Sequence, residues 1–372
     1  MAESKQSQRA GDNSQLLQAN SITIVNGIDE KRVREICAET YEIARKNFTE
    51  DAYMCANERV LKFENALIPK IEVIENAYSS FADPSFQFLL TSAQKTAAAT
   101  EREADYDMLA ELLACRIAKG DSRKNRVGIS RAVEIIDKVD DDALCALTVA
   151  YAVTKFIPAS GESTTGLQAL NDLFESIIYL DLPSGGDWIE HLDILDAVRI
   201  SSFGSFKKTR EYYCEQLKGY SSAGIKINSE EYDKALQLLK DAKLSSSILH
   251  KNPNMNDYVL LPVINRDSIK GLNMTSTIIA NGTPINISRK ITNEECSALE
   301  AIWDLYTADI NINKTAEEVF IAQWDGFPAL HKLHLWWDNL PILFNITHVG
   351  AVLAYTNAKR CDGNIPELPL AT

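Results

Sequence analysis

The sequence contains no long apolar run and no apolar segment near its first residue. No stretch of it approaches the roughly 20 consecutive apolar residues that cross a bilayer. The opening residues, MAESKQSQRAGDNSQ, are polar and lack the apolar region of a secretory signal. These absences predict a cytoplasmic protein with no membrane partner.

Paired cysteines and the common catalytic motifs are also missing. The seven cysteines are scattered singly, without a Cys-x-x-Cys pair, and Cys37, Cys115 and Cys296 fall in apolar helical patterns. This distribution predicts reduced core thiols rather than a disulfide framework. There is no GxxxxGK[ST] phosphate loop, no GxGxxG after a strand and no GxSxG elbow. The sequence therefore favours a protein that is not an enzyme, and we expect no cofactor.

Basic residues are fewer than acidic ones: the chain has 38 Lys and Arg, 52 Asp and Glu, and a net charge of −14. A field of that sign repels phosphate backbones, which disfavours non-specific nucleic-acid binding. One local basic cluster stands out: Arg116, Lys119, Arg123, Lys124 and Arg126, joined by Arg131. It suggests an anion, nucleotide or RNA site. No aromatic residues are interleaved for base stacking, so a solvated loop paired with acids is the favoured interpretation.

Hydrophobic periodicity predicts a mainly α fold. From Asp29 onward, apolar residues recur at helical spacing, and Pro69 should end or kink one helix before Ile71. Three local signals mark helix starts: Asp83-Pro84, the capping box Thr292-x-x-Glu295, and Thr347.

The pattern changes from about 257 to 288, where β-prone runs flank Asn281-Gly282 and predict a hairpin. From 291 to 360 a helix–helix–strand–helix rhythm predicts a winged-helix-like C-terminal module. Its candidate recognition helix within 315–338 carries few cations, which favours protein contacts over DNA.

Four segments are expected: a β-rich oligomerisation tag at 1–27, a helical domain at 28–157, a second helical lobe at 158–250, and the β-hairpin plus the winged-helix-like C-terminal module at 251–372. The short β-prone pieces of the tag cannot bury a core alone. We expect copies from several subunits to stack into a homo-oligomer, with a locally packed tail as the alternative. The oligomerisation residues are Gly11, Asp12, Asn13, Leu16, Ile22 and Ile24.

Two clusters offer metal-binding side chains. Asp187, Glu190 and His191 share one face of a predicted helix and could hold a divalent ion or form a general-base pair. His331 and His334 are spaced i and i+3, without the Glu of an HExxH motif. Helix capping explains the first cluster and packing explains the second, so no metal is expected, and a metal-dependent hydrolase is the second alternative.

The sequence resembles a bacterial family of mainly helical cytosolic proteins. Its opening, AGDNS followed by Gln18-Ala19 and VNG, is similar to the GDNS…QA tag found on various bacterial proteins. The later matching pieces are Glu58-Arg59-Val60, FADPSFQ at 81–87, Ala93-Gln94, Thr347-x-x-Gly350 and Ala354-x-x-Asn357. The resemblance supplies no catalytic residues and implies an association with anti-phage defence.

Together these observations predict a homo-oligomeric interaction or sensor protein of the bacterial cytosol, with the tag setting assembly and the helical body holding a protein partner. The first alternative is a nucleic-acid-associated regulator or effector that uses the basic cluster and the C-terminal module.

Overall fold

The computed structural model describes residues 29–44, 49–119, 122–280 and 283–366. As predicted, the fold is mainly helical. The helices are α1 (Glu30–Ala44), α2 (Glu50–Glu72), α3 (Pro84–Ala99), α4 (Glu103–Lys119), α5 (Arg123–Ile135), α6 (Asp141–Lys155), α7 (Ser163–Ile177), α8 (Asp187–Ile194), α9 (Thr209–Gln216), α10 (Lys218–Ser221), α11 (Glu230–Asp241), α12 (Asn293–Trp303), α13 (Ile310–Asp325), α14 (Pro328–Asp338) and α15 (His348–Cys361). Short 3-10 turns are η1 (Ala77–Ala82), η2 (Ile136–Lys138), η3 (Ser246–Ile248) and η4 (Asp267–Gly271).

The strands form three small antiparallel sheets. Strand β1 (Val198–Ile200) pairs with β7 (Phe344–Ile346), which joins the middle of the chain to its C-terminal part. A second sheet has the order β2–β4–β3, and a third is the hairpin β5–β6. The remaining bounds are β2 (Ile225–Lys226), β3 (His250–Lys251), β4 (Tyr258–Leu260), β5 (Asn273–Ala280) and β6 (Thr283–Lys290).

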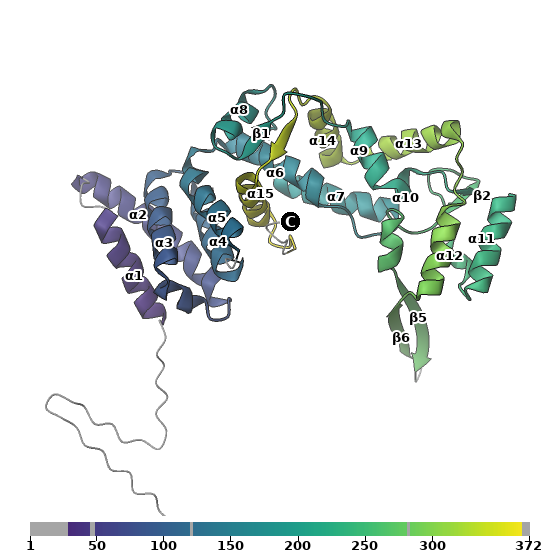
Figure 1. Cartoon of the computed structure of the whole chain (residues 1–372), viewed down its shortest axis with the longest axis horizontal. Helices are drawn as coiled ribbons and strands as arrows, with labels where there is room; N and C mark the ends of the chain where they lie inside the picture. Colours follow the sequence, from purple (N-terminus) through teal and green to yellow (C-terminus); the bar gives the residue numbers. More distant parts are fainter. Residues whose placement is uncertain (1–28, 45–48, 120–121, 281–282, 367–372) are drawn as a thin grey trace, which may run out of the picture.

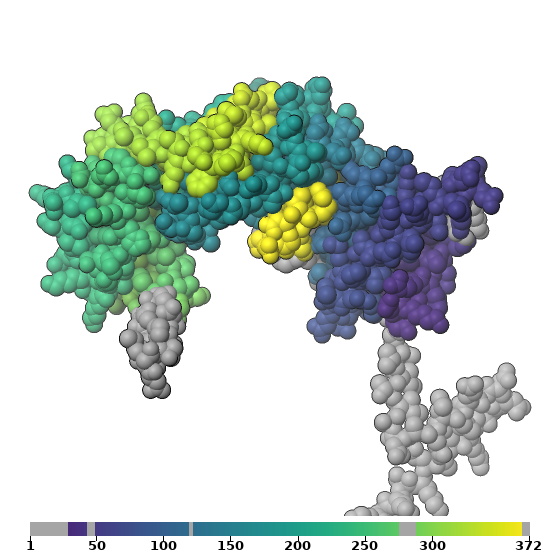
Figure 2. Space-filling model, turned by 180° about the vertical axis from the view of Figure 1, so that it is seen from behind, coloured from purple at the N-terminus to yellow at the C-terminus, as the bar shows by residue number. Residues whose placement is uncertain are grey.

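The molecule has the shape of an arch (Figure 1). One side is an N-terminal lobe of α1–α5, and the top is a bridge of α6–α8, α14 and α15 with the β1–β7 pair. The other side is a distal lobe, residues 225–303, which carries the β5–β6 hairpin. Seen from behind, the surface is hollowed between the two sides, and the end of α15, in yellow, lies in the hollow (Figure 2).

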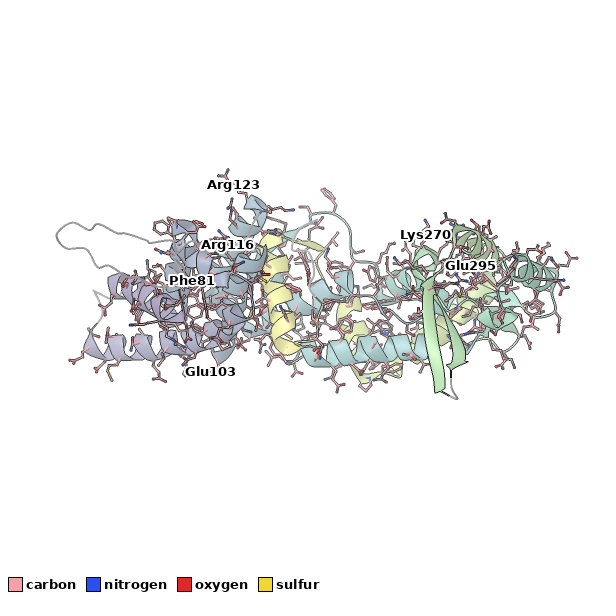
Figure 3. All side chains as sticks on the ribbon, turned by 90° about the horizontal axis from the view of Figure 1, so that it is seen from below. Phe81, Glu103, Arg116, Arg123, Lys270 and Glu295 are labelled. Atoms are coloured by element: carbon pink, nitrogen blue, oxygen red, sulfur yellow. The ribbon has the colours of Figure 1, made fainter. Side chains whose placement is uncertain are left out.

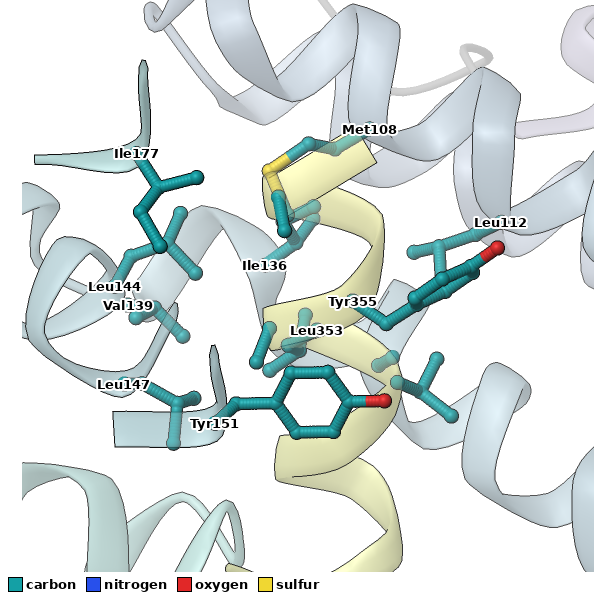
Figure 4. Close-up of a cluster of buried hydrophobic side chains, with 14 of the residues drawn as sticks. Met108, Leu112, Ile136, Val139, Leu144, Leu147, Tyr151, Ile177, Leu353 and Tyr355 are labelled. Atoms are coloured by element: carbon teal, nitrogen blue, oxygen red, sulfur yellow. The ribbon is translucent and has the colours of Figure 1, made fainter. Parts of the chain in front are cut away.

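Helix α15 is the centre of the main core. It packs against α4, α5, α6 and α7, although all four helices end before residue 178 and α15 begins only at His348. Leu353 and Tyr355 of α15 are fully buried among apolar side chains from α4 and α6, including Met108, Leu112 and Leu147 (Figure 4). Burying such side chains contributes roughly 1.5–3 kcal/mol each. The last helix therefore holds the N-terminal lobe to the bridge.

The hydrophobic clusters do not follow the predicted domain boundaries. The main cluster runs from Val33 to Ile365 and includes residues on both sides of 157/158. The second cluster spans Ile225 to Trp303 and crosses 250/251. The C-terminal elements also do not pack as one separate unit, because α12 belongs to the distal lobe, β7 pairs with β1 and α15 packs on α6. The winged-helix-like module is therefore not confirmed.

Predictions based on neighbouring residues agree with the structure better than predictions of how distant elements pack. Asp83 caps α3 by accepting from the amide of Ser85, and the capping box before α12 is complete. The hairpin at 273–290 is present, with its Asn281-Gly282 turn outside the described residues. The alternative in which the helix ends before Ile71 needs correction, since α2 continues through Pro69 to Glu72. Proline in the last turn of a helix removes one backbone hydrogen bond, so the helix ends shortly after it rather than at it.

None of the helices in the described part of the chain combines the length and the apolar character that crossing a bilayer requires.

Candidate anion-binding pocket

A pocket of about 450 Å³ opens where α5, α6, β7 and the start of α15 meet. This volume is within the usual range for small-molecule sites, about 300–1,000 Å³. Among the described residues that line it there is no Asp or Glu, although the whole chain carries a net charge of −14. The lining residues are Lys124, Ala150, Tyr151, Thr154, Lys155, Phe206, Trp337, Leu343, Phe344, Asn345, Ile346, Thr347, His348 and Ala351.

Two lysines from different helices supply the positive charge. Lys124 lies in the first turn of α5 and Lys155 in the last turn of α6. Within the described residues, neither side chain forms an ion pair, and both residues are exposed. Lys155 complements the negative end of its helix dipole, whereas Lys124, with Arg123 and Arg126 beside it, lies at the positive end of α5. The dipole disfavours that placement, and a bound anion would offset it.

The N-terminus of α15 adds backbone donors. Thr347 caps this helix, since its Oγ1 accepts from the amide of Gly350 at 3.1 Å and donates to the carbonyl oxygen of Asp196 at 2.6 Å. The amides of His348 and Val349 have no hydrogen-bond partner among the described residues. Free amides at a helix start carry partial positive charge and bind anions. His348 lines the pocket, so one of these two free amides belongs to a residue of its wall.

His348 is held in its neutral form. Burial lowers the pKa of its imidazole below the usual value of 6.5, and the charge of Lys124 lowers it further. Lys124 and His348 line the same pocket, at the contact between α5 and α15. At neutral pH His348 therefore adds a polar ring rather than a charge.

Aromatic residues form the apolar side of the pocket. Phe206 packs with its ring centroid 4.9 Å from that of Trp337 and 5.1 Å from that of Phe344. Trp337 and Phe344 are buried, whereas Phe206 is only partly buried. Tyr151 completes this side, and burial raises the pKa of its phenol to about 12, so it remains a hydrogen-bond donor at neutral pH.

The predicted basic cluster is divided by the structure. Arg116 is largely buried and lies 3.6 Å from the carboxylate of Asp83, on the same lobe as Arg123 but in a structural role (Figure 3). Arg131 pairs with Glu134 at 3.2 Å and with Asp196 at 3.3 Å.

Within the cluster, only Lys124 lines the pocket, and Arg123 and Arg126 lie beside it on α5. The side chain of Lys119 lies outside the described part of the chain.

The structure also places the residues of the predicted metal-binding clusters. Asp187, Glu190 and His191 do not assemble a metal site, and no group of three or more His, Cys, Asp or Glu side chains in the described residues is placed to hold a metal. Nε2 of His191 instead accepts from the amide of Asp140 at 3.3 Å, because α8 packs against the start of α6.

His331 and His334 both contact Oδ1 of Asp325, at 3.2 and 2.7 Å. The tag residues Gly11, Asp12, Asn13, Leu16, Ile22 and Ile24 lie outside the described residues.

Residues of the motifs that carry the family resemblance have structural roles. Gln94 is fully buried and donates to the carbonyl oxygen of Cys37 at 2.9 Å, which ties α3 to α1. Asn357 is fully buried and donates to Oγ1 of Thr148 at 2.9 Å, which ties α15 to α6. A Cβ on Gly350 would come within 1.9 Å of a backbone carbonyl oxygen. These motifs therefore specify how α3 and α15 pack.

Four residues of the pocket lining were not identified as site residues from the sequence: Lys155, His348, Phe206 and Trp337. They come from α6, α15, the segment before α9 and α14, and only the folded chain brings them together. The sequence predicted a solvated loop over Arg123, Lys124 and Arg126, so the conflict between these cations and the dipole of α5 became visible only in the structure.

The chain is a mainly helical protein with a pocket lined by cationic and aromatic side chains. A family model described as “:-like” matches residues 27–368, and the chain belongs to that family. The description names no activity, substrate or partner. No curated protein and no solved structure matches the chain.

Proposed function

We propose that the protein is a non-catalytic sensor that binds a small anionic molecule in the pocket between α5, α6 and α15. The observation that carries this proposal is the presence of Lys124 and Lys155 without ion-pair partners among the described residues, in a pocket whose lining includes no carboxylate. Unpaired cations that share a cavity repel each other and gain from a shared anion.

The position of the pocket supports a sensing role. Its lining comes from the N-terminal lobe through Lys124 and from the bridge through Lys155, Trp337 and His348. A ligand that contacts all of these residues favours the conformation in which lobe and bridge are joined. The shift in the conformational equilibrium is set by the difference between its affinities for the two conformations. Binding would then be communicated to partners through the lobe arrangement.

The proposal is tested by thermal unfolding of the full chain with increasing inorganic pyrophosphate. We expect the midpoint to rise with concentration, because a ligand that binds only the folded state stabilises it. Lys124→Ala should remove most of the rise. Lys95→Ala, which removes an exposed lysine of α3 that does not line the pocket, is the matched control and should keep the rise. No rise in the wild type, or an equal rise in Lys124→Ala, contradicts the proposal.

The assembly and the setting of the protein are also part of this proposal. The β-prone N-terminal segment supports a homo-oligomer of the bacterial cytosol with a protein partner, and the family resemblance supports an association with anti-phage defence. Light scattering of the full chain and of a version starting at Ile28 tests the assembly. A fall from a defined oligomer to a monomer is expected, and an unchanged mass contradicts the role of the tag.

A further inference from the structure

Resting on the proposed function, we propose that the anion is a nucleotide: a phosphate group at the lysine side of the pocket, joined to a planar heteroaromatic base at the aromatic side. The pocket has two chemically different walls, and a ligand that uses both must be charged at one end and flat and weakly polar at the other.

The cationic wall fits a phosphate group. Lys124 provides an ammonium group, and His348, in the first turn of α15, contributes a backbone amide without a hydrogen-bond partner among the described residues. Ammonium groups and helix-start amides together are the usual protein donors to phosphate. Lys155, in the last turn of α6, provides a second cation in the same lining.

The aromatic wall fits a base. Phe206 is the aromatic residue of this wall that is not buried, and its ring contacts the rings of Trp337 and Phe344. A ring supported in this way is a stacking platform, and stacking is available to every base. The exposed amide of Asn345 lies in the same lining and can pair with the donor and acceptor edge of a base.

The same chemistry argues against a sugar phosphate and against a nucleic acid. A polyhydroxyl ligand needs many hydrogen-bond acceptors, and the described lining has no carboxylate and is apolar along one side. A nucleic acid needs a continuous basic surface, whereas Arg116 and Arg131 of the basic cluster are paired with acids and the chain is strongly acidic.

Isothermal titration calorimetry of the full chain distinguishes these ligands. The probes are inorganic pyrophosphate, ribose 5-phosphate, the four common ribonucleoside diphosphates and a single-stranded oligonucleotide. We expect at least one nucleoside diphosphate to bind tenfold or more tightly than ribose 5-phosphate and pyrophosphate. Phe206→Leu should weaken that binding by about fivefold or more and leave pyrophosphate unchanged. Phe203→Leu, an exposed phenylalanine of the same segment, is the matched control and should change neither.

Each of the other possible results contradicts a defined part of the proposal. Equal affinity for pyrophosphate, ribose 5-phosphate and the nucleotides overturns the nucleotide inference and leaves the anion proposal standing. An oligonucleotide that binds more tightly than any mononucleotide, with a steep salt dependence, overturns it in favour of a nucleic-acid interface. Absence of binding by every probe overturns the proposed function itself. If Phe206→Leu weakens pyrophosphate and nucleotide equally, Phe206 supports the pocket and is not a stacking surface.

Discussion

Gly128 of α5 leaves room for the imidazole of His348 at the start of α15. A Cβ on Gly128 would come within 2.3 Å of Cδ2 and 2.7 Å of Nε2 of His348. The contact joins the helix that carries Lys124 to the helix whose N-terminus lies at the pocket wall. The close approach of α5 and α15, and so the geometry of the pocket, therefore depends on a residue without a side chain.

We expect Gly128→Ala to lower the free energy of unfolding by about 1–3 kcal/mol, the usual cost of overpacking a filled site. Alanine in a helix is otherwise favoured over glycine by about 0.5–1 kcal/mol. In a His348→Ala background the same change should therefore be neutral or stabilising. Urea unfolding of the four proteins measures this difference. Equal destabilisation in both backgrounds would show that the His348 contact is not the cause.

The lowered pKa of His348 predicts a pH effect on stability. Below the ordinary pKa of 6.5 the unfolded state takes up a proton that folded His348 resists. Stability is thus full above that value and falls as the pH drops from it towards the lowered folded pKa. His348→Gln should lose less stability than the wild type between pH 7.5 and 5 in urea unfolding. Identical losses would contradict the assignment.

Short-range features were predictable from the sequence, and contacts between distant elements were not. The caps at Asp83, Thr292 and Thr347 depend on residues within three positions, and all three are present. The pairing of β7 with β1 and the packing of α15 on α6 depend on residues far apart in the chain. For the same reason the sequence identified Lys124 as a candidate anion-binding residue and did not identify Lys155, which only the folded chain brings to the pocket.

Arg102 is predicted to be a major stabilising residue. Its guanidinium bonds Asp105 at 2.7 Å, Asp141 at 2.5 Å and the carbonyl oxygens of Ile136 and Val139 at 2.7 and 2.8 Å. The side chain of Asp105 is fully buried, so Arg102→Ala leaves a buried carboxylate without its cation. We expect a loss of about 3–5 kcal/mol.

The matched control for this change is Arg34→Ala, which breaks the exposed pair with Glu30. Its cost should stay below about 1 kcal/mol in the same chemical denaturation experiment. Comparable losses in the two variants would contradict the role given to Arg102.

The free energy of unfolding of the distal lobe should fall at acid pH, and the ion pair of Arg289 should determine the size of that fall. Arg289 bonds both carboxylate oxygens of Glu295, at 2.6 and 2.8 Å, and the amide of Thr292 adds a third bond. These bonds lower the pKa of Glu295 to about 2, with the Arg289 bond as the largest cause. The stabilisation is complete above pH 4.5 and is lost as the pH falls from there towards 2.

Arg289→Gln should therefore reduce the free energy of unfolding at pH 7 and flatten its loss between pH 5 and 2.5. Arg266→Gln, which breaks an exposed bidentate pair with Asp304 in the same lobe, should have a smaller effect. Thermal unfolding across this pH range is the measurement. An unchanged acid profile in Arg289→Gln would show that Glu295 is held by its backbone bond alone.

The most direct test of the central claim is the calorimetric stoichiometry of anion binding. Pyrophosphate titrated into the full chain should saturate one site per chain, with an affinity that falls as salt is added. The double variant Lys124→Ala/Lys155→Ala should lose at least tenfold in affinity, whereas Lys95→Ala/Lys234→Ala, which removes two exposed lysines outside the pocket lining, should retain it. Binding that survives the first double variant unchanged, or that is weakened equally by both, would contradict an anion site at this pocket.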